Sequence, residues 1–257
     1  MDSSRNAPVA DWRDCDVAYA TRPGKTYVQP FRDAYGDDYP EEAEPHSFLT
    51  RTDLARIVRC LAIGPGKVLV DLGSGRGGPA LWLARETGAD LVGIDLSPNG
   101  VGLAGQRAAE MGLSGRARFV VGDLCATGLP DQSCDGAVSI DVLMYVPDKA
   151  AAVKEAARLL RPGARFALTA FEEENPKLYS LLLQDNGFEV EVDEEKPDWR
   201  SRQRVLYQRI VAEQEALTEE MGEGARVLIE EAEHFLATFR ADGWAGTRHA
   251  FLVGRRT

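Results

Sequence analysis

The chain has 257 residues, a hydrophobic fraction of 44% and a formal net charge of −11. This length suits one α/β domain with a substantial core, and no run of about 18 apolar residues predicts a membrane span. The negative charge disfavours nucleic acid and anionic membranes as partners, because both attract clustered positive charge.

The N-terminal part of the chain differs in composition from the rest. Residues 1–50 are aromatic, acidic and interrupted by prolines, and we expect them to form a cap of short helices before a domain over residues 51–257. The first residues are polar and lack the pattern of a secretory signal, so we expect a cytoplasmic protein. A helix is expected over residues 52–62, ended by Gly64-Pro65-Gly66.

From residue 67 onward, short apolar runs alternate with helical stretches. The runs occupy residues 68–70, 90–95, 117–121, 136–140 and 165–169, and the helical stretches occupy 79–87, 98–111 and 149–160. Continuous apolar runs are typical of strands buried on both faces. Because strands that alternate with helices require crossover connections, the pattern predicts a doubly wound, mainly parallel sheet.

The C-terminal part adds two strands with a helical insertion between them. The strands are expected at residues 187–192 and 249–253, and the charge-rich insertion at about 199–242. Apolar residues of the insertion share one face at helical spacing, namely Leu228, Ala232, Phe235, Leu236 and Phe239. This face is expected to pack on the domain, and the insertion is a candidate substrate lid.

A glycine-rich loop joins the first strand to the first helix of the sheet. Gly73, Gly75 and Gly78 satisfy the G-x-G-x-x-G spacing of dinucleotide sites. Glycines permit close approach of a ligand to the backbone, and the following helix directs free N–H groups at it. Asp95 follows the second strand and suits a ribose hydroxyl of either a nicotinamide cofactor or S-adenosylmethionine.

Two further acids favour S-adenosylmethionine. Asp71 precedes the first glycine by two residues, where a carboxylate suits an ammonium and a sulfonium better than a pyrophosphate. Asp123 follows the third strand, where it could accept a hydrogen bond from an adenine amino group, with Leu124 against the ring.

Five segments together resemble the motifs of class I methyltransferases. They are residues 68–77, 92–97, 122–124, 133–139 and 159–164. The resemblance implies a seven-stranded sheet with an antiparallel last strand, and S-adenosylmethionine as a cofactor that is converted to S-adenosylhomocysteine. It also implies a cofactor site in which Asp71, Gly73 and Gly75 contact the methionine part, Asp95 the ribose, and Asp123 and Leu124 the adenine. Ser74, Leu96 and Ile140 complete that predicted site.

The resemblance is greatest to bacterial methyltransferases that act on small natural products. It implies a small-molecule acceptor methylated at oxygen, with nitrogen and carbon as alternatives. Candidate catalytic residues are His46 in the cap, Asp141 after the fourth strand and His249 at the start of the last strand, with Glu172 as a further candidate base. No metal is expected, since no paired-acid or zinc pattern is present.

Two other functions stay open at this level. A methyltransferase fold can hold its cofactor structurally while the pocket catalyses a cyclisation or rearrangement, because fold does not fix function. A non-catalytic binding protein is the other possibility. The sequence does not decide the oligomeric state.

Overall fold

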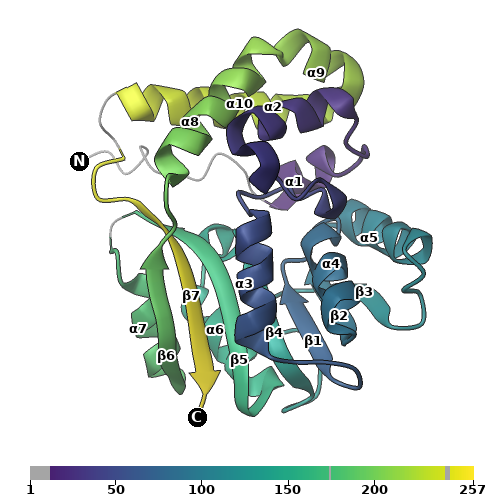
Figure 1. The fold of residues 1–257 in the computed structure, drawn as a ribbon, viewed down its shortest axis with the longest axis vertical. Coiled ribbons are helices and arrows are strands. Elements are labelled where there is room, and N and C mark those ends of the chain that lie inside the picture. Colours follow the sequence, from purple (N-terminus) through teal and green to yellow (C-terminus); the bar gives the residue numbers. More distant parts are fainter. Residues whose placement is uncertain (1–11, 174, 241–243) are drawn as a thin grey trace.

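The computed structural model describes residues 12–173, 175–240 and 244–257 (Figure 1). Its strands are β1 (Val68–Leu72), β2 (Asp90–Asp95), β3 (Ala117–Val121), β4 (Cys134–Ile140), β5 (Leu160–Glu172), β6 (Phe188–Glu195) and β7 (Arg248–Arg256). They form one sheet in the order β3-β2-β1-β4-β5-β7-β6. The first five strands are parallel, and β7 is antiparallel to β5 and β6. The predicted doubly wound sheet with an antiparallel last strand is confirmed.

Helices cover both faces of this sheet. One face carries α3 (Arg51–Leu61), α4 (Gly78–Thr87) and α5 (Pro98–Glu110), and the other carries α6 (Lys149–Leu159) and α7 (Leu178–Asp185). Alternate residues of a strand point to opposite faces. Leu69 therefore packs in the first layer, and Val70 and Leu72 pack in the second. The helices α3 to α6 agree with the predicted ranges to within one residue at each end.

The helix α7 was missed by the sequence analysis. Its N-cap residue, Lys177, makes no capping hydrogen bond with its side chain. The cap comes instead from Glu172 on β5, which accepts a hydrogen bond from the N–H of Tyr179 at 2.9 Å and also pairs with Arg248. A cap supplied by an earlier strand leaves no local signal of the kind that marks most helix starts.

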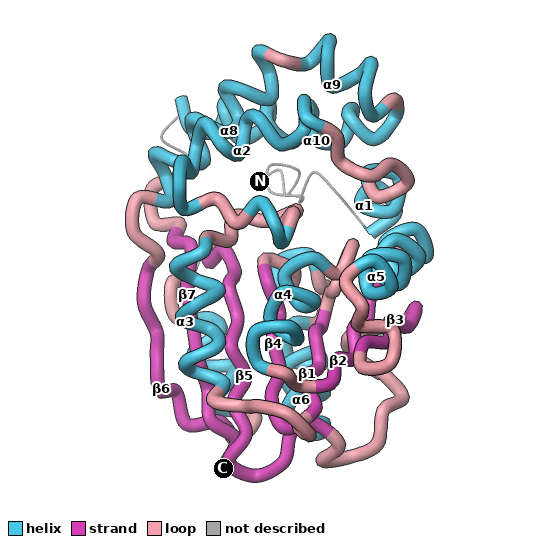
Figure 2. Tube along the Cα trace, turned by 45° about the vertical axis from the view of Figure 1, so that its right-hand side comes forward, coloured by secondary structure: helices cyan, strands magenta, loops and turns pink. Residues whose placement is uncertain are grey.

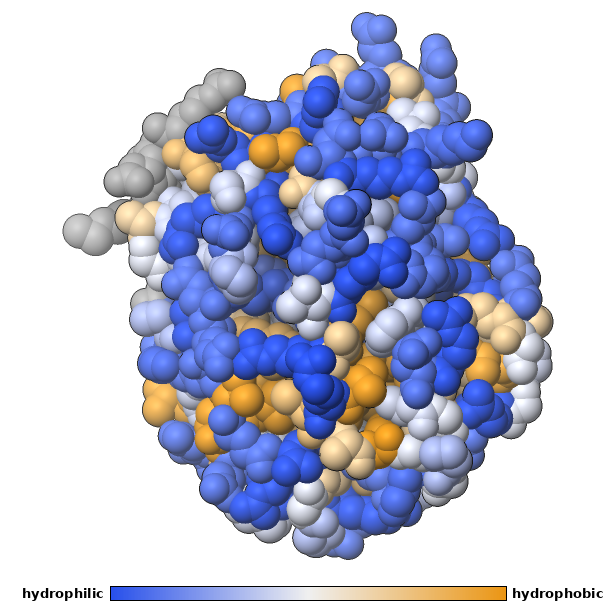
Figure 3. Space-filling view, in the orientation of Figure 1, coloured by the Kyte–Doolittle hydropathy of each residue, from blue (hydrophilic) through white to orange (hydrophobic). Residues whose placement is uncertain are grey.

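A further set of helices lies over the carboxyl ends of the strands (Figures 1 and 2). This helical layer consists of α1 (Trp12–Ala18), α2 (Lys25–Tyr35), α8 (Trp199–Ala212), α9 (Gln214–Met221) and α10 (Glu223–Arg240). The face of the layer seen in Figure 3 is largely hydrophilic, while its inner residues form an apolar cluster that includes Tyr27, Phe31, Leu206 and Leu228. Within the described ranges, no helix combines the length and the apolar character needed to cross a membrane.

The predicted insertion forms three helices of this layer. It is interrupted at Glu213 and at Gly222, whose φ of 57° is left-handed. Leu228 and Ala232 are buried as predicted, and Phe235 and Leu236 pack on the same cluster, where α10 contacts α8. Residues 241–243 of the insertion and residues 1–11 of the expected cap lie outside the described residues.

The two parts of the helical layer are joined by Glu220 of α9. Its carboxylate accepts hydrogen bonds from the backbone N–H groups of Gly24, Thr26 and Tyr27, at 3.2, 2.9 and 3.0 Å. The first N–H groups of a helix have no partner within the helix, and an anion there is favourable. Glu220 therefore caps α2 from a position 196 residues later in the chain.

We predict that Glu220→Ala lowers the free energy of unfolding by about 1 kcal/mol, the usual effect of removing a helix cap. Urea denaturation measures the change. Glu219→Ala is the matched control, because Glu219 is exposed on the same helix. Equal stability of the two variants would contradict the capping role.

Candidate active site

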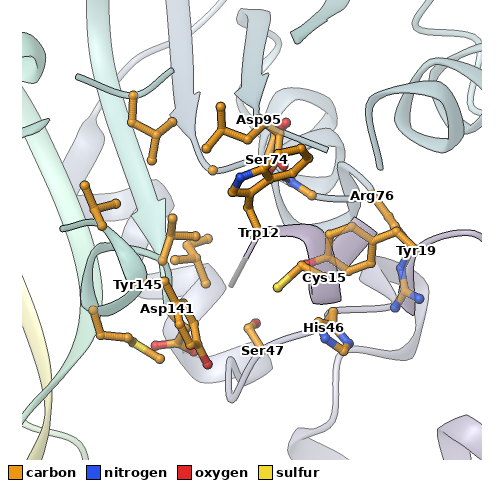
Figure 4. Close-up of a pocket in the computed structure, with 18 of the residues that line it drawn as sticks. Trp12, Cys15, Tyr19, His46, Ser47, Ser74, Arg76, Asp95, Asp141 and Tyr145 are labelled. Atoms are coloured by element: carbon orange, nitrogen blue, oxygen red, sulfur yellow. Dashed lines mark hydrogen bonds between the residues drawn. The ribbon is translucent and has the colours of Figure 1, made fainter. Parts of the chain in front are cut away.

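A cavity of about 740 Å³ lies between the carboxyl edge of the sheet and the helical layer. Open α/β sheets bind ligands at this edge. The cavity is lined by every residue predicted to bind a cofactor: Asp71, Gly73, Ser74, Gly75, Asp95, Leu96, Asp123, Leu124 and Ile140. Figure 4 shows Ser74 and Asp95 on one side of this space and Asp141, Ser47 and His46 on the opposite side.

The glycine loop needs glycine for both conformation and space. Gly73 and Gly75 have φ angles of 91° and 47°, in the left-handed region that favours glycine. A Cβ at Gly73 would lie 2.4 Å from the side chain of Val142, and one at Gly75 would lie 3.1 Å from the hydroxyl of Tyr19. The N–H groups of Gly73 and Ser74 donate to the carbonyl of Ile94, which fixes the loop against β2.

Asp71 presents an unpaired carboxylate oxygen at the end of β1. The side chain is buried, and its Oδ1 has no hydrogen-bond partner in the part of the chain that the structure describes. Burial, with a smaller contribution from Asp95, raises the pKa of Asp71 from its usual 3.8 to about 8. A buried acceptor without a donor is unfavourable, and a cationic ligand group such as an ammonium would satisfy it.

Acids at the ends of β2 and β3 hold the neighbouring loops. Asp95 accepts hydrogen bonds from the N–H of Gly75 at 2.7 Å and from the N–H of Ser97 at 2.8 Å. Asp123 accepts one from the N–H of Cys125 at 2.8 Å. Each carboxylate oxygen can accept more than one bond, so both side chains retain acceptor capacity for hydroxyl or amino groups in the cavity.

A polar network clamps the backbone of Phe48 on the opposite side. Its N–H donates to Oδ2 of Asp141 at 3.0 Å, and its carbonyl accepts from Nζ of Lys196 at 2.7 Å. Lys196 also pairs with Asp53 at 2.8 Å, and Asp53 forms a capping box with Thr50 at the start of α3. These contacts join the end of β4, the N-terminal segment, α3 and the residue after β6.

Asp141 pairs with the predicted residue His249. Its Oδ1 lies 2.7 Å from Nε2 of His249 on β7. Burial and the Lys196 cation lower the pKa of His249, so the imidazole is neutral near pH 7 and Nε2–H donates to the carboxylate. Burial alone would raise the pKa of Asp141, but His249 and Lys196 hold it well below its usual value. Asp141 lines the cavity, whereas His249 stacks on Phe171 behind it.

His46 reaches the cavity through a second network. Its Nδ1 lies 2.6 Å from the hydroxyl of Tyr27, and Nη2 of Arg76 donates to the same hydroxyl at 3.3 Å. Because the Tyr27 oxygen accepts from Arg76, its own proton is available for Nδ1, which places the imidazole proton on Nε2. Burial and Arg76 lower the pKa of His46 to about 3, so the ring is neutral and acts as a donor.

Several cavity residues escaped the sequence analysis. The helical layer and the loop after β4 contribute Trp12, Tyr19, Phe31, Tyr145, Tyr207 and Glu231. Glu231 did have a signal, because it stands three residues after Leu228 and four before Phe235, on the apolar face of α10. Charged residues are rare on such a face unless paired or functional. Glu172, the further candidate base, is buried against Arg248 instead.

Tyr145 and Lys149 show the Y-x-x-x-K spacing of short-chain dehydrogenases, which the sequence analysis overlooked. The structure does not assemble that pair as a nicotinamide site. Nζ of Lys149 donates to the carbonyls of Met144 and Val146 at 3.1 and 3.0 Å, and only Tyr145 of the pair lines the cavity.

Comparison with known proteins identifies the central part of the chain. Residues 70–168 match the family described as "Methyltransferase domain". The chain is 37% identical over 108 residues to methyltransferase GfsG of Streptomyces halstedii, covering 42% of this chain and 39% of that protein. It is 32% identical over 155 residues to 27-O-demethylrifamycin SV methyltransferase of Amycolatopsis mediterranei, covering 60% and 56% of the two chains.

Residues 70–168 therefore carry a methyltransferase domain. The fold agrees, because the crystal structure of the [4+2]-cyclase SpnF matches with a TM-score of 0.71 and 20% identity, over 90% of this chain and 93% of that one. The methyltransferase domain offers S-adenosylmethionine a fitting site, since the unpaired oxygen of Asp71 suits its ammonium group. The chain spans 39% and 56% of the lengths of the two curated relatives.

We predict a pH-dependent gain in stability for Asp71→Asn. The folded-state pKa of Asp71 is about 8 against its usual 3.8, so the wild type binds this proton more tightly when folded and loses stability as pH rises between those values. The variant should have a higher Tm than the wild type at about pH 8.5 and a similar Tm at about pH 4.

The same variant should bind S-adenosylhomocysteine about 10 to 100 times more weakly, the usual effect of losing a hydrogen bond to a charged group. Asp90→Asn serves as control, because Asp90 is exposed at the start of β2. A difference in Tm that does not change with pH would contradict the raised pKa.

We also predict that Gly75→Val weakens S-adenosylhomocysteine binding at least about 100-fold, or roughly 2.7 kcal/mol. The valine is strained at a φ of 47° and would meet Tyr19. Calorimetric titration measures the affinity, with Gly105→Val as control because nothing lies within 4 Å of a Cβ at Gly105. Near-normal affinity of Gly75→Val would refute the role of the loop.

Proposed function

We propose that this protein transfers the methyl group of S-adenosylmethionine to a hydroxyl group of a small molecule, an intermediate in the biosynthesis of a natural product. The observation that carries the proposal is that the motif residues at the ends of three strands line one cavity, together with an unpaired Asp71 oxygen. The name of the Amycolatopsis relative, a 27-O-demethylrifamycin SV methyltransferase, supports a small molecule and an oxygen acceptor.

In this proposal the ends of the strands hold the cofactor. Asp71 receives the ammonium group, and the backbone of Gly73, Ser74 and Gly75 lies against the methionine part. Asp95 accepts from the ribose hydroxyls. The adenine is held by Asp123, Leu124, Leu96 and Ile140. The remaining acceptor capacity of Asp95 and Asp123, which accept the backbone N–H groups named above, supports these roles.

The bound cofactor supplies an electrophilic methyl group, so the protein needs to orient an acceptor and exclude water. Asp141, held ionised by His249 and by the N–H of Phe48, fixes the wall beside the end of β4. His46 offers a neutral N–H donor to the ligand. His249 acts through Asp141 as a positioning residue, because it does not line the cavity.

The helical layer is proposed to enclose the acceptor. The N-terminal cap and the insertion both contribute apolar side chains to the cavity, among them Phe31, Leu206, Ile210 and Leu228. Their packing against each other makes the two segments one cover. Such a surface suits an acceptor with a large apolar skeleton.

The test is incubation of the purified protein with methyl-labelled S-adenosylmethionine and a panel of hydroxylated polyketides and phenols, followed by mass spectrometry. A product that carries the labelled methyl group in place of one hydrogen, formed together with S-adenosylhomocysteine, is the expected result. A product of unchanged mass with the cofactor intact would instead indicate cyclisation or rearrangement. Tight cofactor binding with no change in any compound would contradict both.

A further inference from the structure

The helix α10 presents a carboxyl group, Glu231, to the cavity. Its Oε1 accepts a hydrogen bond from the hydroxyl of Tyr207 at 3.0 Å. Its other oxygen has no hydrogen-bond partner among the described residues. Val227 and Leu228, on the same face of the helix, are buried and line the same cavity. A carboxyl group placed among apolar residues is unfavourable unless it has a partner, so the free oxygen points to a ligand.

The surroundings of Glu231 are mainly aromatic hydroxyls. Titratable groups near it are Tyr27 of α2, Tyr145 of the 3₁₀ turn η4 (Leu143–Tyr145) and Tyr207 of α8, while Arg13 and Cys15 of α1 line the same cavity. Burial raises the pKa of each of these tyrosines, so their hydroxyls stay protonated. Burial also raises the pKa of Glu231 to about 7, although the Tyr207 hydrogen bond lowers it somewhat.

The location of Glu231 in the cavity can be compared with that of Asp141, which follows β4. Tyr145, which follows β4, has both Asp141 and Glu231 among the charges that influence its pKa. Asp141 and Glu231 therefore both lie near Tyr145, and all three residues line the cavity. An acceptor held against the helical layer would meet Glu231 there.

Three other acids of the cavity, Asp141, Asp71 and Asp95, are less suited to accept a proton. Both oxygens of Asp141 are occupied, by His249 and by the N–H of Phe48, and its pKa lies well below its usual value. Asp71 and Asp95 stand at the ends of β1 and β2, in the proposed cofactor site. Glu231 has a free oxygen and an aromatic environment, and it comes from the segment that covers the acceptor.

We propose that Glu231 is a catalytic residue, the general base whose free oxygen accepts the proton of the acceptor hydroxyl during methyl transfer. This inference rests on the proposed function above. It specifies the acceptor as an uncharged, largely apolar molecule whose reacting hydroxyl lies among the rings of Tyr145 and Tyr207.

The step balances in charge and atoms. Glu231 takes the hydroxyl proton and becomes neutral, while an electron pair of the acceptor oxygen forms the bond to the methyl carbon. The pair from the broken sulfur–carbon bond stays on sulfur and neutralises its positive charge. A base with a pKa near the working pH is the most effective, and proton transfer of this kind contributes about 10² to 10⁴ in rate.

The first experiment compares wild type, Glu231→Gln and Glu233→Gln with 2-naphthol as acceptor, following formation of S-adenosylhomocysteine. Wild-type kcat should rise with pH and level off above about pH 7, because the base must be ionised. Glu231→Gln should lower kcat about 100-fold or more and lose this rise, with unchanged cofactor affinity. Glu233→Gln, exposed on the same helix, should match the wild type.

Tyr207→Phe gives a readout that a purely structural role would not produce. Removing its hydrogen bond should raise the pKa of Glu231 and move the rise in kcat to higher pH. The inference is overturned if Glu231→Gln keeps kcat within about threefold of the wild type and the same pH profile.

A second experiment does not depend on methyl transfer. It measures binding of 4-nitrophenol to the complex with S-adenosylhomocysteine, since the phenol and phenolate forms absorb at different wavelengths. Beside an ionised Glu231 the bound phenol should keep its proton to a higher pH than it does in Glu231→Gln. Identical spectra and affinities in the two proteins would overturn the inference about Glu231, whereas absent methyl transfer with a clear difference here would count against the proposed function alone.

Discussion

The two sides of the cavity, formed by the sheet edge and by the helical layer, depend on how the backbone of Phe48 is held. Asp141 holds its N–H and Lys196 holds its carbonyl, so a segment before the sheet is fixed to residues after β4 and β6. The buried carboxylate of Asp141 has a hydrogen-bond donor in His249, and the buried ammonium of Lys196 has a partner of opposite sign in Asp53. Buried ions persist only when they are paired in this way, so removing one partner would leave the others in an unfavourable state.

The acids along the sheet edge of the cavity were predictable from the sequence because their positions follow from local patterns. Asp71, Asp95 and Asp123 each stand at or just after the end of an apolar run, and the carboxyl ends of parallel strands meet at one edge. The rest of the cavity depends on contacts between distant segments. Glu231 meets Tyr207 only because α10 packs on α8, and His249 meets Asp141 only because β7 inserts between β5 and β6. The helix α7 was missed because a distant strand residue caps it.

The carboxyl groups of the cavity divide into two electrostatic classes. Asp141 is stabilised as an anion by donors from the protein. Asp71 and Glu231 have raised pKa values, and each has one oxygen without a hydrogen-bond partner among the described residues, so folding leaves them less favourable than they would be in water. Such unfavourable placement is common where a ligand completes the site, and it explains why substitutions there can stabilise a protein while reducing its function.

The capping of α2 by Glu220 has a consequence for how the chain is made. The helix α2 leaves the ribosome before the carboxylate that satisfies its first N–H groups, because Glu220 follows Gly24 by 196 residues. The parallel strands β1 to β5 emerge within that interval and can pair first, while β7, the last strand, still has to enter beside β5. Contacts between such distant segments form slowly, so the cavity is closed only after α8 to β7 have been synthesised, when the strands that carry the glycine loop already exist.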